Sequence, residues 1–588
     1  MSTKLKKYGN LSGLILFPIV HFYLLEAYTH NGFTEVRPWS QLFNILLFEL
    51  AAWILIFLFR SVKWALRAEG ICAMVIGLVN YYVYTFRSLP FVPWDVFSIG
   101  TAFSVVDQYQ FMPTFQVAAV LVGFGIVLYL EGFLEVDFKK WKWYMTLSAA
   151  VAAALCLGAF SGVLQEEDFQ NRHRMYNKLF TPVYMWQVNG FALTMVMELP
   201  YLSVEKPAGY QTEKAKDMLA SYESSGKNDS EKDAAEDAMP NIIVIMDEAF
   251  SDLSVLGDFQ TNQDYMPYVR HLFTEADNTI TGYLNVSVCG GNTANTEFEF
   301  LTGNTMAFLP QGSIPYQQYI HDSIPALPSY LRELGYETYG MHPYLAHGWE
   351  RDEVYPLLGF SHTKFMEDYQ NRDYVRKYIS DKSCMDEIID TYEKKDAGKP
   401  LFLFQVTMQN HGSYQDAHEN FTPDITVEGA SSYSLSSYLS LVKKTDEALE
   451  YLISYFSQEE EPVMVVFFGD HQPNDVVAQP IWQLHGKSYR SLSEEDTFLR
   501  YQVPYLIWTN YDSQTVRHAD TSANYLGAKV LEAAGLKLPA YQNFLLELSK
   551  SYPVVSAAGI LKETDAKMDL EEYKKLQYYQ LFDMQEEK

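Results

Sequence analysis

The chain has 588 residues and a formal net charge of −29. That length exceeds one ordinary domain and predicts two or more structural units. The acidic excess argues against a nucleic-acid-binding protein, because a nucleic-acid partner calls for a basic surface. The 4 cysteines are too few and too scattered for a disulfide framework or a thiolate metal site, so the composition indicates no redox chemistry.

Apolar residues are concentrated in the first third of the chain, where five segments are long enough to cross a bilayer, which takes about 20 apolar residues each. These segments lie near residues 11–28, 41–60, 69–86, 116–134 and 143–163. Buried helices of a soluble core are the alternative, but five in succession with short polar links favour membrane spans. We therefore predict a polytopic α-helical membrane domain over residues 1–163.

Lysine and arginine residues predict the orientation of these spans. They gather before the first span, between the second and third, and between the fourth and fifth, as Lys4, Lys6, Lys7, Arg60, Lys63, Arg67, Lys139, Lys140 and Lys142. The alternate loops hold little more than Arg37 and Arg87. Because positively charged loops stay in the cytoplasm, we expect a cytoplasmic N-terminus and an extracellular chain after the fifth span.

The remaining chain changes character at residue 241. Residues 164–240 begin with a mixed segment, expected to lie on the membrane or against the outer domain, and continue as a polar, acidic linker with room for one helix. From Asn241 onward, helix-like stretches alternate with the apolar runs "NIIVIMDE", "YETYGMHP", "PLFLFQVTMQNH" and "PVMVVFFGDH". Such runs are typical of buried parallel strands with crossover helices, so we predict an α/β domain over residues 241–588.

Polar side chains end each of these predicted strands. They are Asp247 and Glu248, His342, Asn410 and His411, and Asp470 and His471. In open α/β sheets, ligands bind outside the carboxyl ends of the strands, so we expect these side chains to converge on one crevice. Each has an ordinary explanation by itself, such as helix capping or a surface histidine, but their joint occurrence favours a functional site.

These side chains and Thr293 together suggest a metal-dependent nucleophile. Glutamate, aspartate and histidine suit Mn²⁺, Mg²⁺ or Zn²⁺, and a divalent ion lowers the pKa of a coordinated hydroxyl. Thr293 follows Gly290 and Gly291 at the predicted start of a helix, where backbone N–H groups favour an anion. Helix N-capping is the alternative role for this threonine, but it explains neither the glycines nor the metal-binding set. The sequence thus predicts phosphoryl or phosphodiester transfer through a covalent phospho-threonine.

Several motifs together resemble those of the lipoteichoic acid synthase family. They are "NIIVIMDEAFSDL", "CGGNTANTEFEFLTG", "GMHPYLAHGWERDEVYPLLGF", "TMQNHGSY" and "FFGDHQP", with a similar closing segment "DLEEYKKLQYYQLFDMQ". Members of that family are membrane-anchored, sulfatase-fold phosphoglycerol transferases of the alkaline phosphatase superfamily. The resemblance covers nearly the whole chain and implies an extracellular α/β domain of the sulfatase/alkaline-phosphatase type after the five spans.

The resemblance also implies roles for individual residues. It assigns one divalent metal ion, usually Mn²⁺, to Glu248, Thr293, Asp470 and His471, and makes Thr293 the nucleophile. His411 resembles the family's active-site histidine, a candidate for hydrogen bonding the substrate or shuttling its proton.

Three further residues are expected to bind substrate. Trp349 and Arg351, in "HGWERD", match a pair that contacts glycerol phosphate in the family. Arginine suits bidentate recognition of a phosphate, and tryptophan gives an apolar wall for a glycerol carbon chain. His342 completes this set. On the sequence alone, Arg351 would more often be a partner in a surface salt bridge.

Two departures from the family pattern concern the acceptor. Tyr344 stands where the family often carries an acidic residue, and "QPND" follows Asp470 and His471 in place of a small-residue turn. Both put the identity of the acceptor in question more than the metal chemistry. Cys289 lacks the proline and arginine context needed for maturation to formylglycine, which disfavours a sulfatase activity.

The sequence therefore predicts a phosphoglycerol transferase that moves glycerol phosphate from phosphatidylglycerol to a growing glycerolphosphate chain or a cell-surface glycan. Its partners would be the membrane, the lipid donor and a glycolipid or glycan acceptor. The closest rival is a phosphoethanolamine transferase of the same superfamily, which usually depends on Zn²⁺. The sequence also leaves open a phosphodiesterase and a non-catalytic surface protein.

Overall fold

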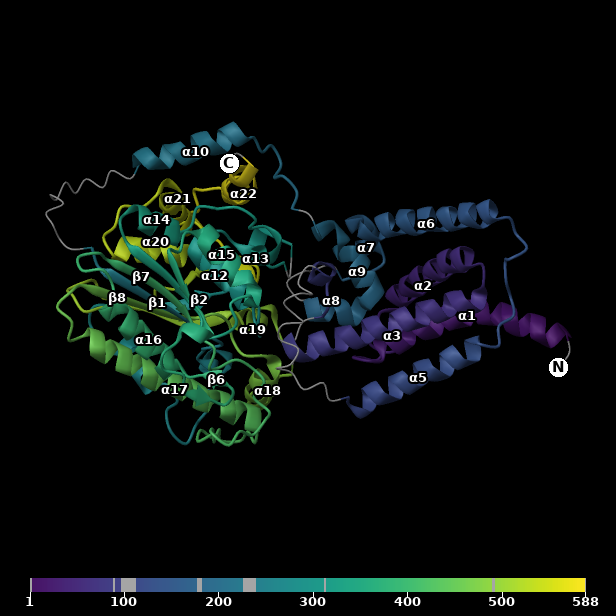
Figure 1. The fold of residues 1–588 in the computed structure, drawn as a ribbon, viewed down its shortest axis with the longest axis horizontal. Helices are drawn as coiled ribbons and strands as arrows, with labels where there is room; N and C mark the ends of the chain where they lie inside the picture. The colour runs from purple at the N-terminus through teal and green to yellow at the C-terminus, as the bar shows by residue number, and fades with distance from the viewer. Residues whose placement is uncertain are drawn as a thin grey trace. The chain divides into compact units, whose positions relative to one another are not determined.

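The computed structural model describes residues 3–87, 90–96, 113–176, 182–202, 204–225, 239–310, 313–488 and 492–586. The chain forms two compact units, Met1–Ser203 and Val204–Lys588. Figure 1 draws the first unit in purple to blue and the second in teal to yellow.

The first unit is helical. Its long helices are α1 (Thr3–Glu26), α2 (Pro38–Phe59), α3 (Val62–Arg87), α5 (Phe115–Glu131) and α6 (Trp143–Gln165). Its short helices are η1 (Pro93–Val96), α7 (Glu167–Arg172), α8 (Pro182–Asn189), α9 (Phe191–Glu198) and η3 (Leu199–Leu202). Helix α1 packs against α2, α3 and α5, and α9 packs against α2 and α6. The segment that follows the fifth predicted span therefore belongs to this helical unit.

Each predicted span coincides with one of the five long helices, but their ability to cross a membrane differs. Among the described residues, Pro38–Phe59 and Trp143–Gln165 are long and apolar enough to do so, whereas Ser12–Glu26 and Phe115–Glu131 are apolar but shorter. Helix α3 carries Glu69 and Asn80, which lower its hydropathy. Length and composition thus support two spans, and the number five stays a prediction.

The second unit is built on an eight-stranded sheet with the order β10-β2-β9-β8-β1-β7-β3-β4. These strands are β1 (Asn241–Asp247), β2 (Thr279–Asn285), β3 (Glu337–Met341), β4 (His362–Lys364), β7 (Leu401–Val406), β8 (Val463–Gly469), β9 (Gln502–Thr509) and β10 (Thr521–Ser522). Neighbouring strands are parallel except at β9, which runs antiparallel to β2 and β8. Two small antiparallel pairs lie outside this sheet: β5 (Tyr374–Val375) with β6 (Tyr378–Ile379), and β11 (Val554–Ser556) with β12 (Gly559–Leu561).

Helices complete the second unit. The α-helices are α10 (Thr212–Ser225), α11 (Pro267–Thr274), α12 (Thr293–Thr302), α13 (Pro315–Gln318), α14 (Leu327–Glu333), α15 (Arg351–Leu358), α16 (Asp381–Glu393), α17 (Tyr433–Phe456), α18 (Asp475–Leu484), α19 (Glu494–Leu499), α20 (Ala523–Ala533), α21 (Ala540–Ser549), α22 (Leu570–Tyr578) and α23 (Met584–Glu586). Short turns of other helix types are η4 (Leu253–Leu256), η5 (Met306–Phe308), η6 (Gly348–Glu350), η7 (Met366–Asp368) and η9 (Tyr579–Asp583).

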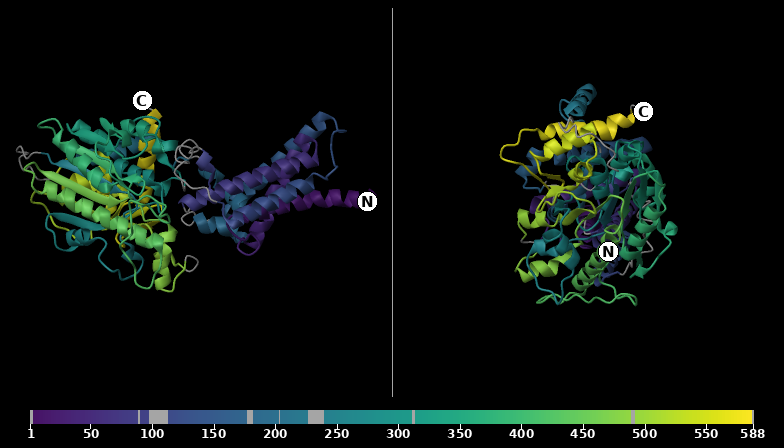
Figure 2. Two further views of the ribbon diagram at one scale, coloured as in Figure 1. Left: turned by 60° about the horizontal axis from the view of Figure 1, so that its bottom comes forward. Right: turned by 90° about the vertical axis from the view of Figure 1, so that its left-hand side faces the viewer.

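The core consists of two apolar layers, one on each face of the sheet. Successive side chains of a strand point to opposite faces, so Ile242 and Val244 of β1 pack into one layer while Ile243 and Ile245 pack into the other. Helices α12, α14, α15 and α20 supply the first layer, and α11, α16, α17 and α18 supply the second. The turned view in Figure 2 shows the long green helix α17 lying along the sheet. Because both faces are covered, the central strands β1, β7 and β8 are largely apolar.

The four predicted strands are confirmed as β1, β3, β7 and β8, and all four are neighbours in the sheet. The helix-like stretches predicted between them are confirmed as α14 and α17. Within the predicted linker, α10 packs against α21 through Ala215 and its neighbours, and residues 226–238 lie outside the described residues.

Candidate active site

The site is assembled where parallel strands end. Strands β8, β1, β7 and β3 lie side by side and run in the same direction, so their carboxyl ends share one edge of the sheet. Glu248 follows β1, while Asp470 and His471 follow β8. Helix α12 begins after β2 and contributes Thr293. As the sequence predicts, acidic and histidine side chains that follow separate strands lie together at this edge.

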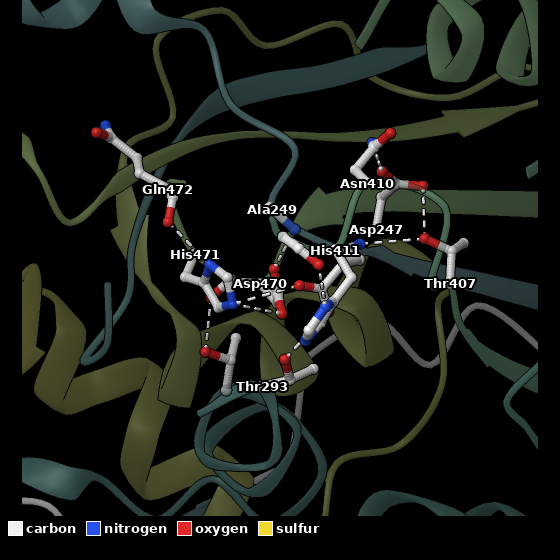
Figure 3. A network of polar contacts seen from close by, with 12 residues as sticks. Asp247, Ala249, Thr293, Thr407, Asn410, His411, Asp470, His471 and Gln472 are labelled. Atoms are coloured by element: carbon white, nitrogen blue, oxygen red, sulfur yellow. Dashed lines mark hydrogen bonds and ion pairs between the residues drawn. The ribbon is translucent and has the colours of Figure 1, made fainter. Parts of the chain in front are cut away.

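Glu248, Asp470 and His471 form a compact buried group. Their possible ligand atoms all lie within 4.8 Å of one another. Nε2 of His471 is 3.3 Å from Oδ2 of Asp470 and 3.7 Å from Oε1 of Glu248. The second oxygen of Asp470, Oδ1, accepts a hydrogen bond of 2.7 Å from the backbone N–H of Ala249, which links the β1 and β8 loops. Figure 3 shows Asp470 and His471 close together, with Thr293 nearby.

This group has the properties of a cation site. Within the described part of the chain, Asp470 Oδ2 and His471 Nε2 are buried and have no hydrogen-bond partner, although native proteins satisfy most such atoms. Burial raises the pKa of Glu248 well above its ordinary value, and the nearby carboxylate of Asp470 raises it further. Burial also raises the pKa of Asp470. A divalent cation would satisfy the two orphaned atoms and offset the repulsion between the carboxylates, so the residues present fit a metal ion.

Thr293 lies beside this group. Its Oγ1 donates a hydrogen bond of 3.3 Å to Oε2 of Glu248. Thr293 is the first residue of α12, whereas the N-cap position belongs to Asn292, which makes no side-chain cap hydrogen bond. Gly290, Gly291 and Asn292 all have positive φ, a conformation that glycine adopts without steric cost. The threonine therefore does not cap the helix, and the turn before it directs its hydroxyl toward the carboxylates.

The backbone carbonyl of Gln472 joins the metal-binding group to the loop that carries Thr293. It accepts hydrogen bonds of 2.9 Å from Nδ1 of His471 and 2.9 Å from the N–H of Gly290. Because a carbonyl oxygen only accepts, Nδ1 of His471 carries the proton and Nε2 presents its lone pair to the site. The side chain of Gln472 is held by Arg500 at 2.6 Å, so the "QPND" segment has a structural role.

A buried network of hydrogen bonds holds the backbone of Glu248 in place. Thr407 Oγ1 donates to Oδ2 of Asp247 at 2.9 Å and accepts from the N–H of Glu248 at 3.1 Å. Asn410 donates to Oδ1 of Asp247 at 3.0 Å, as Figure 3 shows. Asp247 therefore links the ends of β1 and β7. Of the two neighbouring acidic residues Asp247 and Glu248, Glu248 joins the group with Asp470 and His471.

Two histidines lie next to this group. His411 is partly buried, and Figure 3 draws it in one view with His471 and Thr293. Burial lowers the pKa of His411 to about 4. His342 is buried, contacts the carbonyl of Val406 at 3.3 Å, and has its pKa lowered by burial and by the charge of Arg351. Both imidazoles are therefore neutral near pH 7, and a neutral imidazole accepts a proton.

Arg351 is not the exposed residue that the sequence alone favours. Its side chain is 2% exposed and forms an ion pair with Glu297 of α12, which is fully buried. Nε of Arg351 lies 3.1 and 3.3 Å from the two carboxylate oxygens, and Nη1 donates to the carbonyl of Gly348. Tyr355 donates to the same carboxylate at 2.8 Å. Trp349 is partly buried and packs against the apolar layer that contains α12. Direct contact of Arg351 and Trp349 with substrate remains a prediction.

Sequence reasoning missed the residues that support the site. They include Thr407, Glu297, Arg376, Tyr378, Gln472 and Arg500. Thr407 directly follows β7 and precedes His411. Because the other predicted site residues also follow strands, this position could have identified Thr407 from the sequence. The partners of Glu297 and Arg376 are distant in sequence, and no local pattern reveals such pairs.

The α/β domain of this chain is similar to that of known proteins. Residues 240–536 match the model of the Sulfatase family. A putative cyclic beta-1,2-glucan modification protein of Rhizobium meliloti (strain 1021) is 29% identical over 486 residues, which cover 79% of this chain and 73% of that protein. The capsular polysaccharide biosynthesis protein RkpI of the same organism is 28% identical over 236 residues, 40% of this chain and 41% of that protein.

A solved structure shows the same fold. The phosphoglycerol transferase GacH of Streptococcus pyogenes, in complex with sn-glycerol-1-phosphate, aligns with a TM-score of 0.53 at 22% identity. The alignment covers 65% of this chain and 98% of that chain. Since the family model matches half of the chain and includes the strands and loops that carry the candidate site, this chain belongs to the Sulfatase family.

Proposed function

We propose that this chain is a membrane-anchored, metal-dependent phosphoglycerol transferase. It takes glycerol phosphate from phosphatidylglycerol, carries the group on Thr293, and delivers it to a hydroxyl of a lipoteichoic-acid-type chain or a cell-surface glycan. The placement of Thr293 Oγ1 against Glu248, next to Asp470 and His471, carries the proposal. The similarity to GacH, which is named a phosphoglycerol transferase, supports a phosphoglycerol donor. The relatives named for glucan modification and capsular polysaccharide biosynthesis support a glycan acceptor.

One divalent ion would be held by Glu248, Asp470, His471 and the hydroxyl of Thr293. We propose Mn²⁺, and Mg²⁺ and Zn²⁺ are the alternatives. When bound, such an ion lowers the pKa of a hydroxyl and polarises phosphoryl oxygens. The chain's own contribution is to hold these groups in position before substrate arrives. Asp247, Thr407 and the carbonyl of Gln472 provide that support.

The first step of the proposed reaction loads Thr293. As the bond from Thr293 Oγ1 to phosphorus forms, the bond from phosphorus to the diacylglycerol oxygen breaks. The hydroxyl proton of Thr293 passes to solvent, and the departing diacylglycerol oxygen takes up a proton. The N-terminus of α12, which begins at Thr293, stabilises the negative phosphoryl oxygens through its free N–H groups and its dipole.

The second step transfers the group to the acceptor. As the bond from the acceptor oxygen to phosphorus forms, the bond from phosphorus to Thr293 Oγ1 breaks and the threonine is restored. The acceptor hydroxyl must lose its proton, and His411 is a neutral imidazole beside the site. We assign proton acceptance to His411, and substrate binding to His342, Trp349 and Arg351.

The helical unit would anchor the protein in the cell membrane, with the N-terminus cytoplasmic and the catalytic unit extracellular. This placement follows from the lysine and arginine distribution and gives the catalytic unit access to phosphatidylglycerol in the outer leaflet.

One experiment tests the function directly. The purified full-length protein is incubated in detergent with Mn²⁺ and phosphatidylglycerol labelled in its headgroup, with and without a glycolipid acceptor. We expect diacylglycerol release, label on the acceptor, and glycerol phosphate on Thr293 in peptide mass spectra. Phosphoethanolamine on Thr293, obtained only with a phosphatidylethanolamine donor, would replace this assignment with its closest rival. Release of glycerol phosphate to water in the presence of every acceptor tried would indicate a phosphodiesterase.

A further inference from the structure

A small hairpin outside the main sheet holds the loop that carries His411. Strands β5 and β6 pair antiparallel through Tyr374 with Ile379 and Val375 with Tyr378. Arg376 lies in the turn between them, with φ of 56°. The sequence "DYVRKYI" shows no sign of a catalytic role, and these two short strands are absent from the predicted elements.

Arg376 anchors the backbone of that loop. Its guanidinium is buried and donates hydrogen bonds to three carbonyls: 2.7 Å to Gln409, 2.7 Å to His411 and 2.8 Å to Ser413. Three bonds from one rigid, planar group fix the position of the segment on both sides of His411.

Tyr378 contacts the imidazole itself. Its hydroxyl lies 3.1 Å from Nδ1 of His411 and donates to the carbonyl of Gly412 at 3.2 Å. The two rings pack edge to face, with centroids 5.5 Å apart. Tyr378 is only 3% exposed, so this contact is shielded from water.

These contacts determine which nitrogen of His411 carries the proton. Nδ1 lies 2.9 Å from the carbonyl oxygen of Gly412, and a carbonyl oxygen only accepts hydrogen bonds. The proton of the neutral imidazole is therefore on Nδ1, shared with the oxygen of Tyr378, whose own hydrogen points to Gly412. The lone pair is then on Nε2, the nitrogen that is free to accept a proton.

We propose that the β5–β6 hairpin is a positioning element for His411: Tyr378 and Arg376 fix the imidazole with its proton on Nδ1, so that Nε2 accepts the proton of the acceptor hydroxyl. The inference rests on the proposed function. In the step concerned, the acceptor O–H bond breaks and its proton moves to Nε2, while the acceptor oxygen bonds to phosphorus and Thr293 Oγ1 departs with its bonding pair. Thr293 then takes a proton from solvent and His411 releases one, which restores both groups.

The substitution Tyr378→Phe tests this role, because it removes one hydroxyl and keeps the ring. Rapid-quench kinetics of the full-length protein with phosphatidylglycerol and a glycolipid acceptor separate a burst of diacylglycerol from steady turnover. We expect a burst amplitude equal to that of the wild type, a steady rate lowered about 10–100-fold, and an accumulation of glycerol phosphate on Thr293 seen by intact mass. A structural role would instead reduce the burst amplitude, which counts correctly folded sites.

The matched control is Tyr374→Phe on the same hairpin, whose side chain is 46% exposed, and it should behave like the wild type. A second variant, Arg376→Lys, keeps the charge but loses the planar fork, and should lower the steady rate while retaining the burst. A steady rate for Tyr378→Phe within twofold of the wild type would overturn the inference, and so would a burst and a rate that fall together. If the wild type itself releases no diacylglycerol and carries no group on Thr293, the proposed function is overturned along with the inference.

Discussion

At the scale of single residues, the site depends on a hydroxyl placed among groups that would otherwise repel one another. Glu248 and Asp470 are buried carboxylates within reach of each other, and Thr293 donates its hydroxyl hydrogen to one of them. Serine or threonine at a helix start is common for capping, but the cap of this helix is Asn292. The position of Thr293 is therefore explained by the hydroxyl's neighbours rather than by helix formation.

The first prediction concerns that hydroxyl. Thr293→Ala should abolish diacylglycerol release, while the midpoint of thermal unfolding changes little, because the residue does not cap α12. Thr293→Ser should keep measurable activity at an altered rate, since it retains the oxygen but loses the methyl group that restricts its rotamer. A Thr293→Ala protein that releases diacylglycerol at the wild-type rate would exclude this residue as the nucleophile.

The second prediction concerns the metal. Chelation should stop turnover, and Mn²⁺ should restore it better than Ca²⁺, which prefers six to eight oxygen ligands. Asp470→Asn should lower both the bound metal, measured by elemental analysis, and the activity. Asp390→Asn is a suitable control, because Asp390 lies near the end of α16 and pairs with Lys394. Full activity of the metal-free protein would contradict the assignment of Glu248, Asp470 and His471 as ligands.

At the scale of elements, the ion pair between Arg351 and Glu297 joins the start of α15 to α12. Removing one partner of a buried pair leaves an uncompensated charge and typically costs about 3–5 kcal/mol. The third prediction is that Arg351→Ala lowers the free energy of unfolding by about that amount. Denaturant unfolding of Arg351→Ala and of Arg332→Ala, an exposed position on α14, provides the comparison, and the second change should stay within about 0.5 kcal/mol. Equal stability of the two variants, with weaker substrate binding only in Arg351→Ala, would show that Arg351 serves the substrate alone.

The elements also show how far the sequence predicts this fold. Strands β1, β7 and β8 were predictable because central parallel strands covered on both faces are largely apolar, whereas β3, with the sequence "ETYGM", follows this pattern less closely. Strand β2 was missed because its sequence, "TITGYLN", mixes threonine, glycine and asparagine with its apolar residues. Strand β9 contains Pro504, and proline usually argues against a strand inside a sheet.

The candidate site was predictable to a similar degree. Strand ends are visible as polar residues after apolar runs, so Glu248, Asp470, His471 and His411 could be identified. The residues that hold the site in place could not be identified from the sequence. Glu297 and Arg351 are 54 positions apart, and Tyr378 and His411 are 33 positions apart. Pairs at such separations are set by the packing of the whole domain, and the sequence carries no local pattern for them.

At the scale of the whole molecule, the two units differ in how many apolar side chains they expose. The first unit leaves many large apolar side chains exposed, among them Ile15, Leu58, Val122 and Leu155, whereas the second buries its apolar residues in the two layers around the sheet. Exposed apolar side chains along helices are typical of a surface that faces lipid. This pattern fits the membrane anchor that we propose, and two of the described helices are long and apolar enough to cross a bilayer.

The last prediction concerns orientation. Basic residues cluster at the ends of helices that the positive-inside rule places in the cytoplasm, and Lys140, between α5 and α6, is exposed. Ala397 is an exposed loop residue of the second unit. In a background with Cys72 and Cys156 changed to alanine, a cysteine at Ala397→Cys should react with a membrane-impermeant thiol reagent on intact cells. A cysteine at Lys140→Cys should react only after lysis. Because both sites are exposed in the folded protein, accessibility differs only through the membrane. The opposite labelling pattern would place the catalytic unit in the cytoplasm and remove its access to lipid in the outer leaflet.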